Sequence, residues 1–236
     1  MATGKPGGNG MSEQRRHRLR LEISREASRL FWEHGVDATS GDRIAEAVGL
    51  STRTIWRHFR SKESCAEPIV TQGVEWEMSA LRSWPRHLSL EDHLAAEVVR
   101  YENASDAVEH ADALLAIKMI RLADHEPSIR TAWLMACDHV KHQLTVVIAK
   151  RLGHPADGLT VRLHGAAASA ALRVVNEELG AAALHGVVPV DFEGDVIRRM
   201  ARAVRDATGG AIGDAVAPAV AERPQRLCPT AHMTDG

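Results

Sequence analysis

The sequence predicts an all-α protein in which a small N-terminal helical module precedes a larger C-terminal helical domain. Apolar residues recur at spacings of three and four along most of the chain, as expected for helices that bury one face. Aromatic residues make up only 4% of the chain while 44% is apolar, which favours helices packed through aliphatic side chains over a β-sandwich. Alternation typical of strands is confined to short stretches such as residues 187–190.

The first helix is predicted to begin at Arg15 and to end near Gly35. Its apolar positions, spaced three and four apart, are Leu19, Ile23, Ala27, Leu30 and Phe31. Thr39, followed three residues later by Asp42, resembles a capping box and predicts a short second helix that ends at Gly49.

Further helix starts are predicted after residue 50. Ser51 can cap a helix on which Ile55 and Phe59 share one face. Ser61 can cap the next helix, which begins at Lys62. Beyond it, Gly and Pro turns separate helical segments over residues 69–84, 90–101, 114–122, 129–152, 159–184 and 196–207.

The charge is divided unevenly along the chain, although the net charge of the whole is only −2. The first 64 residues carry 12 Lys and Arg against 8 Asp and Glu, and the remaining 172 carry 17 against 23. A basic N-terminal module joined to an acidic domain is a pattern typical of proteins that bind nucleic acid.

Composition also indicates which ends of the chain are flexible and in which compartment the protein is expected. We expect a flexible arm over residues 1–14 and a flexible tail over residues 211–236, because both lack apolar periodicity. The chain has no signal-peptide pattern and no membrane-length apolar run, so we expect a cytoplasmic protein that does not bind a membrane. The three cysteines, Cys65, Cys137 and Cys228, are too far apart for a zinc ribbon.

No metal or cofactor is expected. Cys137, His139 and His142 lie close together in sequence, but Cys137 and His139 are two residues apart and point in different directions on a helix. The three side chains therefore cannot chelate one ion from an intact helix.

Residues 41–59 have the pattern of two short helices joined by a tight turn. Ala45, Gly49 and Ile55 stand where a helix-turn-helix needs a small contact residue, a glycine tolerant of positive φ and a buried anchor. On the second helix, six side chains are not needed for the core and can contact phosphates and base edges: Thr52, Arg53, Thr54, Trp56, Arg57 and His58. This pattern predicts a surface that binds DNA.

Residues 15–65 contain, in order, the motifs Leu30-Phe31, Gly35, Ala38-Thr39-Ser40, Ile44-Ala45, Gly49-Leu50-Ser51, Thr54-Ile55, His58-Phe59 and Ser61-Lys62-Glu63. This series resembles the DNA-binding signature of the TetR family of transcriptional regulators. The resemblance implies a three-helix DNA-binding domain over residues 15–62 and a helical ligand-binding and dimerisation domain over residues 63–210. It also implies a repressor that a ligand releases from DNA, which is the commonest behaviour in that family.

The resemblance further implies DNA contacts at particular positions. Arg53 and Thr54 match positions that commonly face bases. Positions that commonly face phosphates correspond to Thr52, Trp56, His58 and Lys62. The family usually has Tyr in place of Trp56, and an indole can donate a hydrogen bond but cannot accept one.

The other basic side chains of this module allow two interpretations. Arg57 either contacts DNA or is a solvated surface arginine. The same choice applies to the N-terminal arginines, which could bring an arm close to DNA or form a solvated helix face: Arg15, Arg16, Arg18 and Arg20.

The C-terminal domain contains wide apolar side chains that predict a ligand pocket. The expected lining is Trp76, Trp84, Tyr101, Ile117, Ile120, Trp133, Cys137 and Val140. The alternative is that most of these residues belong to a close-packed core. His110 and His125 could contact a ligand or be exposed.

Small side chains in residues 165–171 and 181–183 predict a surface that a partner helix can approach closely. We expect a dimer interface made of two helices from each subunit, at Ala167, Ala170, Ala171, Val196, Met200 and Val204. The alternative is packing within one subunit.

Together these features predict a homodimeric repressor that binds a near-palindromic double-stranded DNA operator and is released by a small, largely apolar effector. A ligand would tilt the helix that follows Lys62 and so change the separation of the two recognition helices. The alternative is a DNA-binding dimer without a small-molecule ligand, controlled by a protein partner or by its expression level. An enzyme is not expected, since the chain lacks GxSxG, P-loop, HExxH and dinucleotide-binding glycine patterns.

Overall fold

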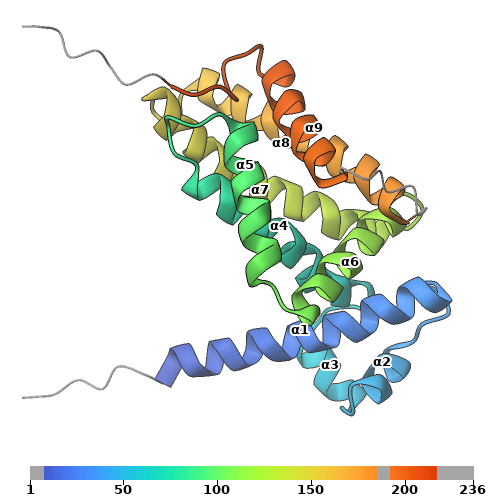
Figure 1. Ribbon diagram of the computed structural model, residues 1–236. Coiled ribbons are helices and arrows are strands. Elements are labelled where there is room, and N and C mark those ends of the chain that lie inside the picture. Colours follow the sequence, from blue (N-terminus) through green and yellow to red (C-terminus); the bar gives the residue numbers. More distant parts are fainter. Residues whose placement is uncertain (1–7, 185–191, 217–236) are drawn as a thin grey trace, which may run out of the picture.

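The computed structural model describes residues 8–184 and 192–216, and its regular elements there are helices (Figure 1). The N-terminal helices are α1 (Gly8–His34), α2 (Gly41–Ala47) and α3 (Thr52–His58), and a 3₁₀ turn, η1 (Glu63–Ala66), follows. The remaining helices are α4 (Glu67–Ser83), α5 (Leu90–Ala104), α6 (Ala107–Leu122), α7 (Pro127–Leu152), α8 (Leu159–Leu184) and α9 (Phe192–Ala207). The described ranges hold no strand, which confirms the all-α prediction, and residues 187–190 lie outside them.

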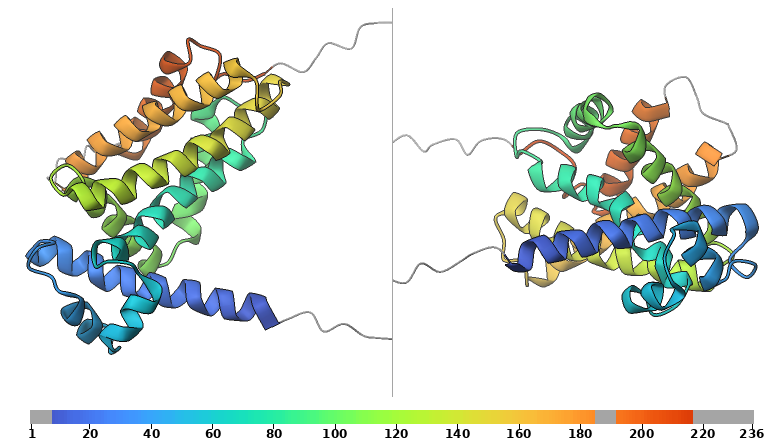
Figure 2. Two further views of the ribbon diagram at one scale, coloured as in Figure 1. Left: turned by 180° about the vertical axis from the view of Figure 1, so that it is seen from behind. Right: turned by 90° about the horizontal axis from the view of Figure 1, so that it is seen from below.

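The helices form two parts that share one apolar core. Helices α1–α3 lie at one end of the molecule, and α4–α9 form the body above them (Figure 1). Seen from behind, α7 and α8 run side by side along the back of the body (Figure 2). Helix α9 packs on α8 and α5, while α4 contacts α1, α6 and α7. The buried apolar residues of both parts belong to a single cluster.

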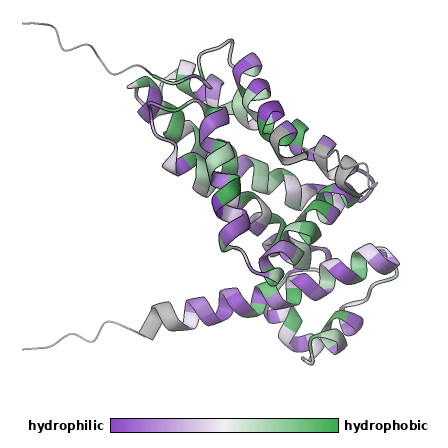
Figure 3. Cartoon of the chain, viewed as in Figure 1, coloured by the Kyte–Doolittle hydropathy of each residue, from purple (hydrophilic) through white to green (hydrophobic). Residues whose placement is uncertain are grey.

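Helix α1 begins at Gly8, so residues 8–14, expected in a flexible arm, continue the helix. Its N-terminal half projects beyond the body and is mostly hydrophilic (Figure 3). Residues 12–18 are exposed, whereas the buried face starts with Ile23. A solvated helical extension has no apolar period, which is why the sequence pattern placed the start at Arg15.

The helix caps agree with the sequence only in part. Ser51 caps α3 as predicted, because its hydroxyl accepts a hydrogen bond from the Thr54 amide at 3.2 Å. The predicted capping box at Thr39 is wrong. Ser40 caps α2 by accepting from the Arg43 amide at 3.1 Å. Thr39 is buried instead, and its hydroxyl donates to the Gly35 carbonyl at 2.8 Å.

A real capping box opens α6 at Asp106 and Glu109, so this helix starts at Ala107, well before the predicted residue 114. The apolar pattern underestimated α6 because residues 107–111 are exposed.

Residues 211–216 were expected in a mobile tail, but they are fixed to the body. The Leu90 amide donates to the Gly213 carbonyl and the Val216 amide to the Arg86 carbonyl, both at 2.7 Å. Ile212 is buried. A single apolar residue creates no periodicity, so this anchor could not be predicted from the apolar pattern.

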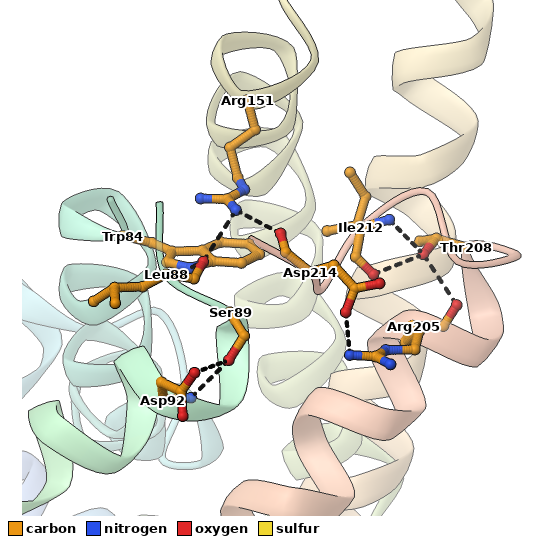
Figure 4. A network of polar contacts seen from close by, with 9 residues as sticks. All are labelled: Trp84, Leu88, Ser89, Asp92, Arg151, Arg205, Thr208, Ile212 and Asp214. Atoms are coloured by element: carbon orange, nitrogen blue, oxygen red, sulfur yellow. Dashed lines mark hydrogen bonds and ion pairs between the residues drawn. The ribbon is translucent and has the colours of Figure 1, made fainter. Parts of the chain in front are cut away.

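The anchor is organised around the buried guanidinium of Arg151 (Figure 4). The guanidinium carbon lies 3.4 Å from the centroid of the Trp84 ring. Its nitrogens donate to the carbonyls of Pro85 at 2.8 Å, Asp214 at 3.0 Å and Leu88 at 3.3 Å. Burial lowers the pKa of Arg151 to about 10. One cation thus joins α7, the loop between α4 and α5, and residues 211–216.

We predict that Arg151→Ala lowers the free energy of unfolding by about 3 kcal/mol, because it removes the donor to several backbone carbonyls and the contact with the Trp84 ring. Urea denaturation followed by circular dichroism measures this change. Arg162→Ala is the matched control, since Arg162 is exposed on α8 and should change stability by less than about 0.5 kcal/mol. Equal losses in the two variants would contradict a structural role for the Arg151 contacts.

Candidate nucleic-acid interface and ligand cavity

Helices α2 and α3 form the helix-turn-helix that the sequence predicts. Gly49 adopts φ +67° in the turn, a backbone conformation that side chains rarely tolerate. The Leu50 amide donates to the Ala45 carbonyl at 2.9 Å and closes the turn. Ala45 is buried where the helices meet, and Ile55 is fully buried beneath α3. These contacts fix the angle at which α3 is presented to solvent.

The outer face of α3 carries the predicted DNA-binding side chains. Arg53, Trp56 and Arg57 are exposed. Two hydroxyls are engaged within the module: Thr52 donates to the Asp42 carboxylate at 2.6 Å, and Thr54 shares a hydrogen bond of 2.8 Å with Ser51. The helix therefore presents two guanidinium groups and an indole to solvent, with the threonines held at its N-terminal end.

Trp56 packs on the first residue of α2, a contact that sequence reasoning missed. A Cβ atom added at Gly41 would overlap the six-membered part of the Trp56 ring. Glycine thus makes room for an indole on the surface between α2 and α3, while Trp56 stays 44% exposed. A glycine at a helix start was the available signal, but it does not identify the neighbour.

Helix α1 adds positive charge beside the C-terminal end of α3. The Arg20 guanidinium lies 4.5 Å from the centroid of the Phe59 ring and donates to the His58 carbonyl. Burial, together with the charges of Arg20, Arg57 and Arg16, lowers the pKa of His58. We call Arg16, Arg20, Arg57 and His58 the α1–α3 basic cluster. An approaching phosphate would offset this repulsion.

Lys62 forms hydrogen bonds within the chain in this structure. The resemblance matches it to a position that commonly faces a phosphate. Its ammonium donates to the carbonyls of Val36 at 2.7 Å and Asp37 at 3.4 Å. Lys62 therefore holds the loop between α1 and α2 in this structure.

The body contains an apolar cavity of about 250 Å³ between α4, α5, α6, α8 and α9, which we call the inner cavity. Its lining includes three residues of the predicted pocket, Trp76, Ile117 and Ile120. A second hollow of about 650 Å³, the outer cleft, adjoins it, since Gly73, Trp76, Val98 and Ala113 line both. Tyr101, also predicted, lines the outer cleft.

The other predicted pocket residues lie elsewhere. Trp133, Cys137 and Val140 surround a void of only about 10 Å³ between α4, α7 and α8, too small for a ligand. Trp84 packs on Arg151, away from the inner cavity. These four therefore belong to the packed core and the C-terminal anchor, because helix periodicity does not distinguish a cavity wall from a filled interior.

The predicted dimer residues are also divided. Met200 and Val204 are covered within the subunit, and Val196 lines the inner cavity, so in this structure these α9 side chains face their own chain. On α8, Gly165 packs on α7 of the same chain, since a Cβ atom added there would overlap Thr145. Ala170 is exposed, while Ala167 and Ala171 are half-buried.

An apolar surface that the sequence did not identify lies on α7 and α8. Four exposed side chains mark it, and we call them the α7–α8 apolar surface: Met135, Leu159, Leu163 and Val174. The spacing of the three α8 residues, at 159, 163 and 174, places them along one face of that helix. This periodicity was visible in the sequence but could equally have indicated a core face.

The described residues contain no group of three or more His, Cys, Asp and Glu that could hold a metal ion. His110 and His125 are both exposed. None of the helices in the described ranges has the length and apolar character needed to cross a bilayer.

Comparison with known proteins finds similarity to one family of regulators. The model of the family described as bacterial regulatory proteins, tetR family, matches residues 23–69. The HTH-type transcriptional regulator TcmR of Streptomyces glaucescens is 30% identical over 152 residues, which cover 63% of this chain and 66% of TcmR, just under two thirds of its length.

Solved structures agree in fold. Salmonella enterica GusR aligns with a TM-score of 0.53 at 19% identity, covering 80% of this chain and 96% of GusR. A tetR-family transcriptional regulator from Streptomyces coelicolor aligns with a TM-score of 0.50 at 19% identity, covering 83% of each chain. Residues 23–69 therefore match the TetR family model and the chain is similar to the regulator TcmR, while the solved structures show a shared fold.

Proposed function

We propose that this chain represses transcription as a homodimer that binds a near-palindromic operator and leaves it when a small molecule enters the inner cavity. The observation that carries the proposal is the outer face of α3, where Arg53, Trp56 and Arg57 are exposed on a helix fixed by a buried helix-turn-helix core. A helix of this kind fits the major groove of B-DNA.

The geometry supports a division of roles on DNA. Arg53, near the N-terminal end of α3, would contact base edges, since the first residues of a recognition helix lie deepest in the groove. The α1–α3 basic cluster and the Trp56 indole N–H would contact phosphates on either side. Phosphate contacts set the position of the helix, and the Arg53 guanidinium would supply preference for guanine.

A second copy of this chain would pack on the α7–α8 apolar surface. The helices α7 and α8 are the two longest helices of the body and lie side by side at its back (Figure 2). Two such pairs would form a four-helix bundle with two-fold symmetry. The dimer would place two α3 helices in successive major grooves, about 34 to 36 Å apart.

An ion pair connects the ligand-binding body to the DNA-binding helices. Arg25 of α1 donates to both carboxylate oxygens of Asp112 on α6, each at 2.7 Å. Gln72 of α4 donates to the same carboxylate at 3.1 Å. The neighbouring residue Ala113 lines the inner cavity, as does Ala116 one turn later. A ligand that displaces α6 would therefore pull on α1.

Helix α4 transmits the same displacement, as the sequence-based mechanism expects. Gly73 of α4 packs so closely on Ala116 of α6 that a Cβ atom at position 73 would overlap it. The inner cavity supports ligand control over the alternative, a DNA-binding dimer controlled by a protein partner.

We predict that Arg53→Ala weakens binding to a site selected from a random duplex library by about 10- to 100-fold, because a bidentate guanine contact contributes about 1 to 3 kcal/mol. Fluorescence anisotropy with the selected site and a scrambled duplex measures the loss of preference. Arg162→Ala, on α8, should bind like the parent chain. An unchanged ratio between the two duplexes in Arg53→Ala would exclude Arg53 from base contact.

We predict that Leu163→Asp converts the chain to a monomer at micromolar concentration, because it places a charge in the centre of the α7–α8 apolar surface. Sedimentation velocity measures the mass. Val99→Asp is the matched control, since Val99 is an equally exposed valine on α5. A parent chain that sediments as a monomer would refute this interface outright.

We predict that Asp112→Asn weakens the coupling between ligand and DNA. The probe is the first compound from a thermal-shift library that stabilises the parent chain. In the parent chain it should lower DNA affinity about 5- to 150-fold. In Asp112→Asn this factor should fall at least about fivefold while the Kd for the compound changes little.

Arg25→Gln should behave like Asp112→Asn, since it removes the same ion pair from the other side. Asp124→Asn is the control, since it alters the ion pair between Arg121 and Asp124 at the C-terminal end of α6. If the compound releases DNA from both ion-pair variants as it does from the parent chain, coupling does not pass through this contact.

A further inference from the structure

The wall of the inner cavity contains a carboxylate without a complete set of partners. Glu77 of α4 is only 6% exposed and lines the cavity. Its Oε2 accepts a hydrogen bond from the Asn176 side chain of α8 at 3.1 Å. Its Oε1 is buried and has no hydrogen-bond partner. A buried carboxylate oxygen left in this condition is unfavourable unless another group binds it.

Among the residues that the structure describes, no cation pairs with Glu77. Burial raises its pKa to about 7, and only the Asn176 hydrogen bond acts in the opposite direction. From α8, Arg173 shares the small void beside Glu77 but pairs with Glu177 at 3.1 Å. From α7, Cys137 is a neutral thiol, because burial raises its pKa to about 12.

The other walls of the inner cavity carry no charge. Among its described lining residues, those of α5, α6 and α9 are apolar: Val98, Ala113, Ala116, Ile117, Ile120, Val196, Ile197 and Met200. An uncompensated carboxylate in an apolar enclosure is therefore the dominant polar feature that a ligand would meet.

The approach to the cavity is also lined by carboxylates, of which Asp112 is paired with Arg25 and Glu75 with Arg82. The described lining of the outer cleft includes four carboxylates and no Lys, Arg or His: Glu75, Glu102, Glu109 and Asp112. Trp76 and Tyr101 face each other across it edge to face, with ring centroids 5.4 Å apart. Acidic residues and aromatic faces both attract cations.

We propose that the inner cavity binds a small amphiphilic amine whose protonated nitrogen pairs with the Glu77 carboxylate while its apolar part packs against Trp76 and Ile117. The inference rests on the proposed function for its effect on DNA, but not for binding itself. With about 250 Å³ available, the buried part of the molecule is one ring with a short chain, and anything larger extends into the outer cleft.

Three probes of the same shape test the charge of the ligand: 4-phenylbutylamine, 4-phenylbutan-1-ol and 4-phenylbutanoate. Isothermal titration of the full chain at pH 7.5 should rank them in that order. The amine should bind at least about tenfold more tightly than the alcohol, since charge-assisted hydrogen bonds are the stronger kind. Equal affinities for amine and alcohol, or tighter binding of the carboxylate, would overturn the proposal.

The variant Glu77→Gln tests the residue. It should weaken the amine about tenfold or more and change the alcohol by less than about threefold, since the neutral amide keeps the shape of the side chain. Glu91→Gln, at an exposed glutamate of α5, should leave all three probes unchanged. An equal loss for amine and alcohol in Glu77→Gln would mean that the site does not recognise charge.

The pH dependence provides a readout that a purely structural role would not change. A cationic ligand requires Glu77 to lose its proton, so the affinity for 4-phenylbutylamine should rise between pH 6 and pH 8 and then level off. The alcohol should show no such rise. If Glu77→Gln does not fold, the probe order and this pH profile of the parent chain decide the question, and an amine affinity independent of pH would contradict it.

DNA release is measured separately, by anisotropy with the selected duplex. Glu77-dependent amine binding without DNA release would contradict ligand control and leave the amine site intact. Release by an uncharged compound that does not need Glu77 would support ligand control and contradict the amine site.

Discussion

Helix α4 has to satisfy two packing surfaces at once, and the remaining structure is arranged around this constraint. Its buried residues Ile69 and Val70 lie against α1, while Val74 and Met78 continue the same apolar cluster into the body. The Ile69 amide donates to the buried Ser24 hydroxyl of α1 at 3.0 Å, so the junction is also hydrogen-bonded. Because the core is continuous, a change in the tilt of α4 would disturb the packing of α1, which in turn contacts α2.

The Arg25–Asp112 ion pair fixes how α1 lies relative to α6 at this junction. Apolar packing resists separation of α1 from the body but tolerates sliding, whereas a bidentate ion pair fixes the relative position of two side chains. Asp112 is buried beside the cavity and Arg25 lies on the helix that supports α3. Under the proposed function, ligand binding would act on α1 as a displacement of α6.

The sequence predicted the fold well wherever a helix buries one face. Residues 129–152 and 159–184 show this, since the observed helices match them within two residues. It failed where structure arises without an apolar period: at the solvated start of α1, at the Asp106 cap and at the anchor formed by Ile212. Each of these depends on solvent exposure, a local cap or a single distant contact.

The two candidate sites also differ in how far local sequence spacing could predict them. The proposed DNA-binding surface is made by one short helix, so local spacing was sufficient to predict that Arg53 and Trp56 are exposed on it. The cavity is assembled from five helices, and residue type alone could not separate Trp76 on its wall from Trp84 at the far end of α4. The sequence could not single out Glu77 among the glutamates on its helices, because only its burial and its unpaired oxygen make it distinctive.

The contacts of residues 211–216 also determine from which end the molecule can be attached to a surface or a fusion partner. This segment is fixed by Arg151 and Arg86 at the end of the body opposite α2 and α3 (Figure 1). A surface or fusion partner attached beyond Val216 would therefore leave the recognition helix facing outward. By contrast, attachment before Gly8 would bring the added mass onto the projecting end of α1, the same helix that contributes Arg16 and Arg20 to the proposed DNA-binding surface.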